Sequence, residues 1–294
     1  MHRNVLYNHE IRDAAEKLIA PGQVGFLNGW GVFSTLRVLD GVLFAFERHY
    51  ARLRRDAELL HIPFSFSQQE LLAALFSLVE ANAAFDAVLR VAVVRNKGGL
   101  FEGPNLDAEY DLVAFTADRN NWGDSARLTC VANARFGASP LAGTKSTSWA
   151  QNLTWYEEAR GRGFDEALLL NEHGQVSECT SANIFVVRGE HVCTPSLRTS
   201  GCLPGVTRTI LLEEVHVPGV VVEERDFDRV LLEGSDCVFI TSTTRDLLPV
   251  TAVDDFSLRK EKAIFDLLRN AFLNYRAAYI ANAPTSKDLV DSCL

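Results

Sequence analysis

Residues 142–149 read Ala-Gly-Thr-Lys-Ser-Thr-Ser-Trp, a stretch that places Lys145 among small and polar side chains just before an apolar segment. Most lysines are solvated surface groups, so position alone gives Lys145 no special role. A lysine held beside a buried site, however, can lose its proton and form a Schiff base with an aldehyde. Lys145 is therefore a candidate nucleophile, and the rest of the chain must supply its partners.

Two stretches that follow Lys145 contain such partners. Glu178 lies in Gly-Gln-Val-Ser-Glu-Cys-Thr-Ser-Ala-Asn-Ile-Phe (174–185), which we interpret as one strand of a hairpin with its turn at 171–174. Leu-Pro-Gly-Val-Thr-Arg (203–208) precedes a helix predicted over 210–215. Backbone N–H groups at a helix N-terminus bind phosphate, and a glycine there lets the ligand approach closely. Taken singly, these features also fit an edge-strand glutamate and a helix capped by Thr207.

An amine, a carboxylate on a strand and a phosphate-binding turn are together the contacts that a pyridoxal phosphate (PLP) cofactor needs. A carboxylate beside the pyridine nitrogen keeps that nitrogen protonated, so the ring accepts electrons when the substrate Cα–H bond breaks. The hydroxyl-rich stretch 241–244 could bind phosphate or a substrate carboxylate, although such clusters are also ordinary turns. Arg48, Arg52 and Arg55 lie within two helical turns, and an arginine turned inward would clamp a phosphate.

Composition excludes several other functions. The 294 residues are 47% hydrophobic and 23% charged, which is ordinary for a globular chain able to form one large or two ordinary domains. The net charge of −9 argues against a nucleic-acid partner. No apolar stretch approaches the ~20 residues needed to span a bilayer, and the first residues lack the apolar region of a secretory signal. Six scattered cysteines (130, 179, 193, 202, 237 and 293) without zinc-like spacing indicate buried thiols in a reducing compartment, no metal site and a cytoplasmic protein.

The hydrophobic pattern predicts two α/β-type domains of an α+β arrangement, with a ligand cleft between them. Residues 1–118 form the smaller domain, 119–125 a polar, turn-rich linker, and 126–294 the larger domain. In the first domain we expect a hairpin at Asp40-Gly41 between strands 32–39 and 42–46, helices from Phe46 and over 68–82, and strands 88–94 and 111–115. In the second, strands 127–132, 166–170, 183–188, 220–224 and 236–241 alternate with helical segments, the last over roughly 258–280.

The chain resembles the class IV, or fold type IV, PLP enzymes, which include branched-chain aminotransferases, D-amino-acid aminotransferases and aminodeoxychorismate lyases. The resemblance runs from about Gly29 to Val250. Its motifs are Gly-Val-Phe-Ser-Thr-Leu-Arg (31–37), His49-x-x-Arg52-Leu53, Lys145, Glu178 with 181–185, 203–208, and 241–244 with Pro249-Val250. It implies a homodimer built from a small N-terminal α/β domain and a larger C-terminal domain with a mixed sheet or barrel.

The resemblance also implies a role for each site residue. Lys145 would form the Schiff base with PLP and move the proton between the substrate Cα and the cofactor. Glu178 would pair with the pyridine nitrogen, and Leu203 would pack on the ring. The phosphate would be held by Arg52, Val206, Thr207 and Thr243, and the backbone at Thr243–Thr244 would meet the substrate α-carboxylate.

Three subgroups remain open. Phe33 stands where the D-amino-acid enzymes have a tyrosine, and Leu100 where they have an arginine, so both positions count against D-specificity. The loop 95–101 is only half a match to the Arg-Gly-x-Gly-Gly-Arg-Gly loop of the lyases, although Thr35 matches a threonine that some lyases use. The aminodeoxychorismate lyase reaction, which yields pyruvate and p-aminobenzoate, is therefore the alternative.

Other positions of the chain match the branched-chain aminotransferases. Arg90 falls where those enzymes keep an arginine for the glutamate side-chain carboxylate, and Arg37 matches a second arginine. Against this, Val88 and Trp149 replace aromatic residues of that subgroup. Phe33, Val88 and Trp149 would line a pocket suited to an aliphatic or aromatic side chain. We therefore expect an aminotransferase that moves the amino group of a branched-chain or other apolar L-amino acid to 2-oxoglutarate.

Overall fold

The computed structural model describes residues 1–100, 102–104, 106–259 and 261–286, and these fold into two compact units. The first unit comprises Met1–Asn120, Thr144–Trp149 and the segment that begins at Ala278, and the second comprises Asn121–Gly143 and Ala150–Ala277. The short segment with Lys145 belongs to the first unit because Ser146 pairs with Val32 in a β-bridge. The division into domains 1–118 and 126–294 with a linker between them stays a prediction.

The first unit contains a six-stranded sheet in which every pair of neighbouring strands is antiparallel. Its order is β2-β1-β6-β5-β3-β4, with β1 at Asn4–Tyr7, β2 at Glu10–Asp13, β3 at Gly31–Leu39, β4 at Val42–Leu43, β5 at Ala87–Arg95 and β6 at Tyr110–Ala117. The expected hairpin is confirmed, since Asp40 (φ 51°) and Gly41 (φ 79°) form a left-handed turn between β3 and β4. The second strand of that hairpin is shorter than expected because Ala45 (φ 54°) turns the chain into a helix.

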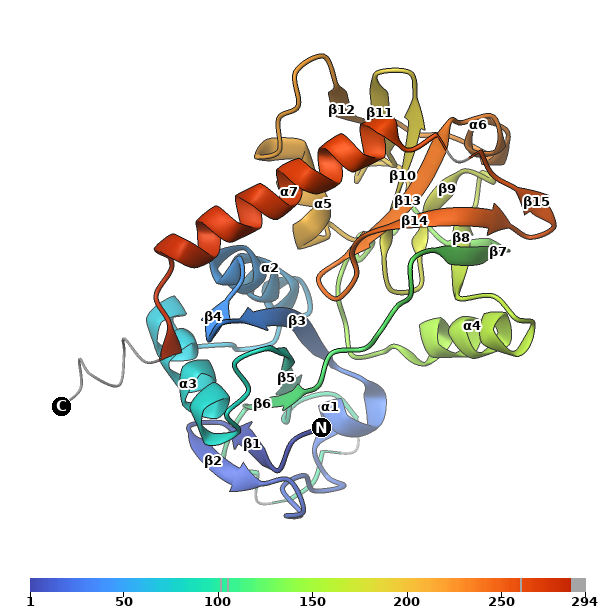
Figure 1. Ribbon diagram of the computed structural model, residues 1–294. Helices are drawn as coiled ribbons and strands as arrows, with labels where there is room; N and C mark the ends of the chain where they lie inside the picture. Colours follow the sequence, from blue (N-terminus) through green and yellow to red (C-terminus); the bar gives the residue numbers. More distant parts are fainter. Residues whose placement is uncertain (101, 105, 260, 287–294) are drawn as a thin grey trace. The chain divides into compact units, whose positions relative to one another are not determined.

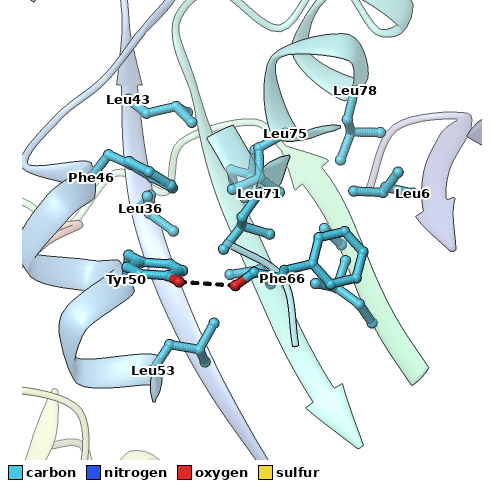
Figure 2. Close-up of a cluster of buried hydrophobic side chains, with 14 of the residues drawn as sticks. Leu6, Leu36, Leu43, Phe46, Tyr50, Leu53, Phe66, Leu71, Leu75 and Leu78 are labelled. Carbon is cyan, nitrogen blue, oxygen red and sulfur yellow. Dashed lines mark hydrogen bonds between the residues drawn. The ribbon is translucent and has the colours of Figure 1, made fainter. Parts of the chain in front are cut away.

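Helices cover this sheet: α1 at Val24–Asn28, α2 at Phe46–Leu59 and α3 at Gln68–Ala81. The start of α3 is set by a capping box, in which Ser67 Oγ accepts from Glu70 N and the Glu70 carboxylate accepts from Ser67 N. The apolar sides of α2 and α3 meet the sheet in one buried cluster, where Tyr50 OH donates to Phe66 O at 2.9 Å (Figure 2). This core fixes the face of α2 that turns toward β3.

The second unit is built on a nine-stranded mixed sheet, whose strands range in colour from green (β7) to orange (β14) in Figure 1. Its strands are β7 (Ala126–Arg135), β8 (Glu166–Asn171), β9 (Val176–Cys179), β10 (Asn183–Arg188), β11 (His191–Thr194), β12 (Val221–Glu224), β13 (Cys237–Ser242), β14 (Asp246–Val253) and β15 (Phe256–Ser257). The order is β12-β11-β10-β13-β14-β7-β8-β9, with β15 paired to β14. The β11–β12, β14–β7 and β7–β8 pairs are parallel and the others antiparallel, so the expected mixed sheet is confirmed.

The helices of this part of the chain are α4 (Ala150–Gly161), α5 (Val206–Glu213), α6 (Arg229–Glu233) and α7 (Ala263–Asn282). The starts of two helices differ from those expected: α5 begins four residues earlier, directly after Gly205, and α7 begins at Ala263. The sequence pattern did not reveal β14, because Pro249 lies in it and proline argues against a central strand. The core between this sheet and α7 includes the stacked rings of Phe185 and Phe239, whose centroids are 5.0 Å apart, and the ring of Phe265 on α7, 5.4 Å from that of Phe239.

Candidate active site

Lys145 lies in the first unit, on the segment Thr144–Trp149 beside β3. Its backbone carbonyl accepts from Phe33 N at 3.0 Å, and its backbone N–H donates to the Asp56 carboxylate on α2 at 3.1 Å. Asp56 is 1% exposed, so this bond ties the lysine backbone to a buried anchor. Lys145 Nζ lies 4.5 Å from the centroid of the Phe33 ring and 5.7 Å from that of Trp149. The half-buried amine is therefore held against two aromatic rings.

Arg90 lies on the same face of the β3–β5 ladder as Phe33. Thr35 is paired with Arg90 in the register, and alternation along β3 puts Phe33 and Thr35 on one face. Arg90 Nε donates to Thr35 Oγ1 at 3.3 Å, and its guanidinium carbon lies 4.6 Å from the Phe33 ring centroid. Trp149 meets the same ring edge-on at 5.7 Å. Burial lowers the pKa of Arg90, and in the part of the chain that the structure describes no carboxylate lies within ion-pair distance of it.

Arg37 occupies a different environment. It is 4% exposed, and its Nε lies 3.9 Å from Asp86 Oδ1. Asp86 also receives Arg119 at 3.0 Å. Of the two arginines proposed for substrate, Arg37 thus already faces a carboxylate, whereas Arg90 faces aromatic and hydroxyl groups.

Arg52 is the buried member of the three arginines near the start of α2. Burial lowers its pKa to about 10, against the opposing effect of the Asp56 carboxylate. Arg52 Nη2 donates to Ser34 Oγ at 2.9 Å, and the same Ser34 oxygen lies 2.9 Å from His49 Nδ1. His49 is 2% exposed, and burial together with the positive charges of Arg52 and Lys145 holds its pKa well below the usual value. Arg52 is thus the arginine that turns inward, and Ser34 links it to His49, for which no role was expected.

Glu178 lies on β9 in the second unit and is 8% exposed. Its Oε1 accepts from Arg135 Nε at 2.9 Å, and its Oε2 accepts from the backbone N–H of Leu203 at 3.0 Å. Arg135 also donates to Asn152 Oδ1 at 3.2 Å, and Asn152 in turn donates to Thr180 O at 2.8 Å. The guanidinium balances the charge of Glu178, and each carboxylate oxygen keeps a further lone pair for a donor.

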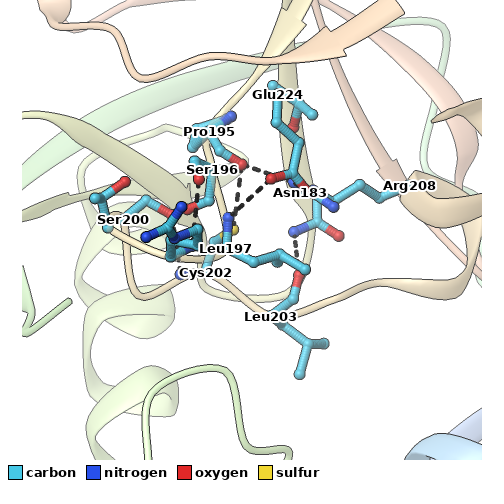
Figure 3. Close-up of polar contacts among 12 residues, drawn as sticks. Asn183, Pro195, Ser196, Leu197, Ser200, Cys202, Leu203, Arg208 and Glu224 are labelled. Atoms are coloured by element: carbon cyan, nitrogen blue, oxygen red, sulfur yellow. Dashed lines mark hydrogen bonds and ion pairs between the residues drawn. The ribbon is translucent and has the colours of Figure 1, made fainter. Parts of the chain in front are cut away.

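The loop before α5 is fixed by a polar network (Figure 3). Asn183 Nδ2 donates to Leu203 O at 2.8 Å, so both backbone groups of Leu203 are engaged. Arg208, 1% exposed, donates from Nη2 to Pro195 O at 2.8 Å and to Glu224 Oε1 at 2.7 Å. The fully buried guanidinium thereby joins α5 to the start of the loop. These hydrogen bonds anchor Leu203 and the turn that follows it.

Val206 and Thr207 are the first two residues of α5. The N-cap is Gly205, without a side-chain hydrogen bond, so the idea that Thr207 caps this helix is wrong. Backbone N–H groups in the first turn of a helix have no partner within the helix. Both residues are buried, at 6% and 4% exposure. Their position suits an anion, as the sequence predicted for phosphate.

Thr243 and Thr244 lie in the tight turn between β13 and β14, and both are half-buried. Ser242 Oγ lies 3.3 Å from Thr244 Oγ1 and accepts from Arg245 N at 3.2 Å. Arg245 anchors the turn through an ion pair with the buried Glu166 at 3.0 Å. The buried pair therefore sets the position of the hydroxyl-bearing turn.

Sequence reasoning missed several residues that position the site. His49 and Asn183 lie inside motifs that the sequence displays, so a signal for them existed. Arg135 and Arg245 had none, because their partners Glu178 and Glu166 lie 43 and 79 positions away in the chain. Within the described ranges, no group of three or more His, Cys, Asp or Glu side chains is arranged for a metal ion. No helix in those ranges is long and apolar enough to cross a membrane.

Comparison with known proteins identifies the family. The model of the family described as "Amino-transferase class IV" matches residues 31–253. The chain is 30% identical over 268 residues to a D-alanine aminotransferase of Bacillus licheniformis, covering 85% of this chain and 88% of that protein. It is 29% identical over 238 residues to a branched-chain-amino-acid aminotransferase of Salmonella typhimurium, covering 77% of each. The chain belongs to the class IV aminotransferase family.

Solved structures confirm the fold. The structure of the Escherichia coli branched-chain amino acid aminotransferase superposes with a TM-score of 0.86 at 22% identity, covering 94% of this chain and 95% of that one. A branched-chain aminotransferase from Thermobaculum terrenum, solved in its PLP form, superposes with a TM-score of 0.81 at 22% identity, covering 94% of each. The antiparallel sheet of the first unit and the mixed sheet of the second are thus those of fold type IV, as expected. The chain is a class IV aminotransferase similar to the branched-chain enzymes.

Proposed function

We propose that this chain transfers the amino group of an apolar, branched-chain L-amino acid to 2-oxoglutarate with PLP as cofactor. The observation that carries the choice is the shared ring of Phe33, which has Lys145 Nζ at 4.5 Å and the Arg90 guanidinium at 4.6 Å from its centroid. The Lys145 amine, which can react, and the Arg90 guanidinium, which has no carboxylate partner among the described residues, thus both lie beside one apolar ring. This arrangement suits a substrate with a reacting amino end and, in glutamate, a distal carboxylate.

The residues present fit the cofactor. PLP, when bound, supplies an aldehyde and an electron-accepting ring. Lys145 would bind the aldehyde and afterwards hold or move the proton at the substrate Cα. Glu178 would accept a hydrogen bond from the pyridine N–H, a role supported by the free lone pairs that remain after its bonds to Arg135 and Leu203. The Leu203 side chain would cover the ring.

A second set of residues would hold the phosphate. Arg52 would contribute a charge, Val206 and Thr207 the N–H groups at the start of α5, and Thr243 the turn after β13. Support comes from the burial of Arg52, at 9% exposure, because an anion stabilises a buried guanidinium in addition to the Ser34 oxygen that accepts from it. A lysine could not replace the planar donor set of this arginine without loss.

Substrate selection would fall to the face of β3 and β5. Phe33 and Trp149 would contact an apolar side chain, and Arg90 would bind the distal carboxylate of glutamate when that substrate occupies the same place. Thr244 would bind the α-carboxylate through its backbone. Arg37 would contribute indirectly, by helping to position β3, the strand that carries Phe33. We also propose a homodimer, as in the family that the sequence resembles, in a reducing compartment such as the cytoplasm, where the unpaired cysteines of the described residues persist.

The test combines three reactions of the purified holoenzyme. L-leucine with 2-oxoglutarate should yield glutamate, whereas D-alanine with 2-oxoglutarate should yield none at the same enzyme concentration. Aminodeoxychorismate alone should release no pyruvate. Pyruvate release without amino transfer would establish the lyase instead, and glutamate formed from D-alanine would establish the D-specific enzyme. Lys145→Ala should lose the near-visible cofactor absorption and the formation of glutamate from L-leucine and 2-oxoglutarate.

Arg90 provides the sharper specificity test. A charge-assisted hydrogen bond contributes about 1.5–3 kcal/mol, so Arg90→Ala should lower kcat/KM for glutamate by roughly 10–100-fold. The same variant should lower kcat/KM for L-leucine by less than about 3-fold, because leucine has no distal carboxylate. Arg162, exposed and 5.4 Å from the Phe164 ring centroid, offers a matched control, and Arg162→Ala should change neither value. Equal losses on both substrates would remove Arg90 from the carboxylate site.

A further inference from the structure

Ser34 Oγ joins two buried groups of α2. It lies 2.9 Å from Arg52 Nη2, which can only donate, and 2.9 Å from His49 Nδ1, which can donate or accept. Ser34 is 1% exposed and His49 2%, so water does not reach either group freely. His49 and Arg52 are three residues apart on one helix face, with Ser34 opposite them on β3.

Counting hydrogens decides the protonation of His49. The Ser34 hydroxyl carries one hydrogen, and across the described ranges the only acceptor near it is His49 Nδ1. If Nδ1 carried the proton, both the Ser34 hydrogen and the Nε2 lone pair would be buried without partners. If Nε2 carries it, only Nε2–H lacks a partner in the described chain. The second arrangement leaves fewer unsatisfied groups and is preferred. A depressed pKa of His49 agrees with a neutral ring.

We propose that Ser34 and His49 are positioning residues that orient the Arg52 guanidinium toward the cofactor phosphate. The order of donation is Arg52 N–H to Ser34 oxygen, and Ser34 O–H to His49 Nδ1. This inference rests on the proposed function, in which Arg52 holds the phosphate. His49 acts here through Ser34 and touches no reacting atom.

The physical reason lies in the length of the arginine side chain. A guanidinium at the end of a flexible chain loses conformational freedom when it binds an anion. An acceptor that fixes one of its N–H groups beforehand removes part of this cost from the binding step. Ser34 can accept in a fixed direction only when its own hydrogen is engaged, and His49 Nδ1 engages it. If Ser34 and His49 served only the stability of the core, apolar side chains of similar shape could replace both with little loss in the free energy of unfolding.

The experiment compares the binding of PLP with that of pyridoxal, which lacks the phosphate. His49→Leu removes the acceptor at similar volume and should raise the Kd for PLP by about 10-fold, while the Kd for pyridoxal changes by less than about 2-fold. Ser34→Ala should show the same pattern, and the double variant should be no worse than either single one. His49→Asn, which keeps an acceptor near the position of Nδ1, should bind PLP within about 3-fold of the parent protein.

The outcomes separate this proposal from the one on which it rests. Equal losses of PLP and pyridoxal binding in His49→Leu and Ser34→Ala, or no loss in either, would overturn the positioning role. If His49→Leu does not fold, Ser34→Ala decides the question alone. Arg52→Met tests the phosphate assignment itself: it should weaken PLP binding and spare pyridoxal, and an equal effect on both would refute that assignment first.

A spectroscopic measurement tests the tautomer without any ligand. In the protein labelled with ¹⁵N at histidine, the two ring nitrogens of His49 should give the shifts of a neutral ring protonated at Nε2, at pH 7. Ser34→Ala should change the Nδ1 shift most, because that nitrogen loses its donor. A proton on Nδ1, or a charged ring at pH 7, would overturn the proposed order of donation.

Discussion

Replacing Gly205 by alanine should destabilise the second unit and weaken cofactor binding. Gly205 is the N-cap of α5 with φ −66° and ψ 139°, a conformation that alanine adopts without strain. The obstacle is the Asn183 side chain, because a Cβ at position 205 would overlap Asn183 Oδ1 and lie 3.2 Å from its Cγ. Asn183 would have to move, and its hydrogen bond of 2.8 Å to Leu203 O would break.

The magnitude follows from three terms. A buried hydrogen bond that is broken without replacement costs about 1–3 kcal/mol. Forcing an extra methyl group into a packed site costs about 1–3 kcal/mol. Replacing glycine by alanine also restricts the unfolded chain, which offsets about 0.4–1 kcal/mol. We therefore expect the free energy of unfolding to fall by about 3 kcal/mol. The Kd for PLP should rise as well, since Leu203 N–H would be displaced from Glu178.

The assay is urea unfolding of the apoprotein, followed by titration with PLP. Gly161 supplies the matched control: it ends α4, and nothing lies within 4 Å of a Cβ placed there. Gly161→Ala should leave stability unchanged or raise it by up to about 1 kcal/mol. In an Asn183→Ala background, Gly205→Ala should cost less than about 1 kcal/mol, because the obstacle is gone. A cost below about 1 kcal/mol in the parent protein, or the same cost in both backgrounds, would refute the reasoning.

Two further predictions concern buried charge. Glu166→Gln leaves the Arg245 guanidinium buried and unpaired at 2% side-chain exposure, so the free energy of unfolding should fall by about 3–5 kcal/mol. The control Arg3→Gln breaks an exposed pair with Asp13 and should cost under about 1 kcal/mol. Similar losses in the two variants would contradict the argument. Burial raises the pKa of Cys202 from 9.0 to about 12, so the native protein keeps a proton that the unfolded chain releases. The free energy of unfolding should therefore fall as the pH rises from about 9 to 12, and it should fall less in Cys202→Ala. Equal slopes against pH in the two proteins would contradict this prediction.

Much of the fold was accessible from local signals. The Asp40-Gly41 turn, the periodic helices α2 and α3 and the runs of buried residues in β8 and β10 follow from side-chain pattern and turn chemistry. The short strands β1 and β2 were not recognised, because four residues offer too little pattern. The strand β14 was not predicted, because it contains Pro249. In β14, pairing with the distant strand β7 outweighs the local preference against proline, whereas β2 pairs with its neighbour β1 and β1 also with β6.

The site followed a similar division. The candidates Lys145, Glu178 and Arg90 came from motif position, and the structure adds the groups that hold them. Nothing in the neighbourhood of Arg135 predicts that it pairs with Glu178, since such a contact depends on the register of β7, β8 and β9. The alternative of a cap at Thr207 is wrong because the helix begins at Val206, directly after its N-cap Gly205.

The family resemblance, the residue types available for chemistry and most of the secondary structure were accessible from the amino-acid order alone, because they depend on neighbours along the chain. The tertiary structure was needed to show that Arg52 is the buried arginine of α2 and that Ser34 joins it to His49. It was also needed to show that Asp86 lies beside Arg37, whereas no carboxylate among the described residues lies within ion-pair distance of Arg90. The physical reason is that burial and pairing are set by packing between elements far apart in the chain. Local pattern supplied the amine of Lys145, and packing placed it against the rings of Phe33 and Trp149.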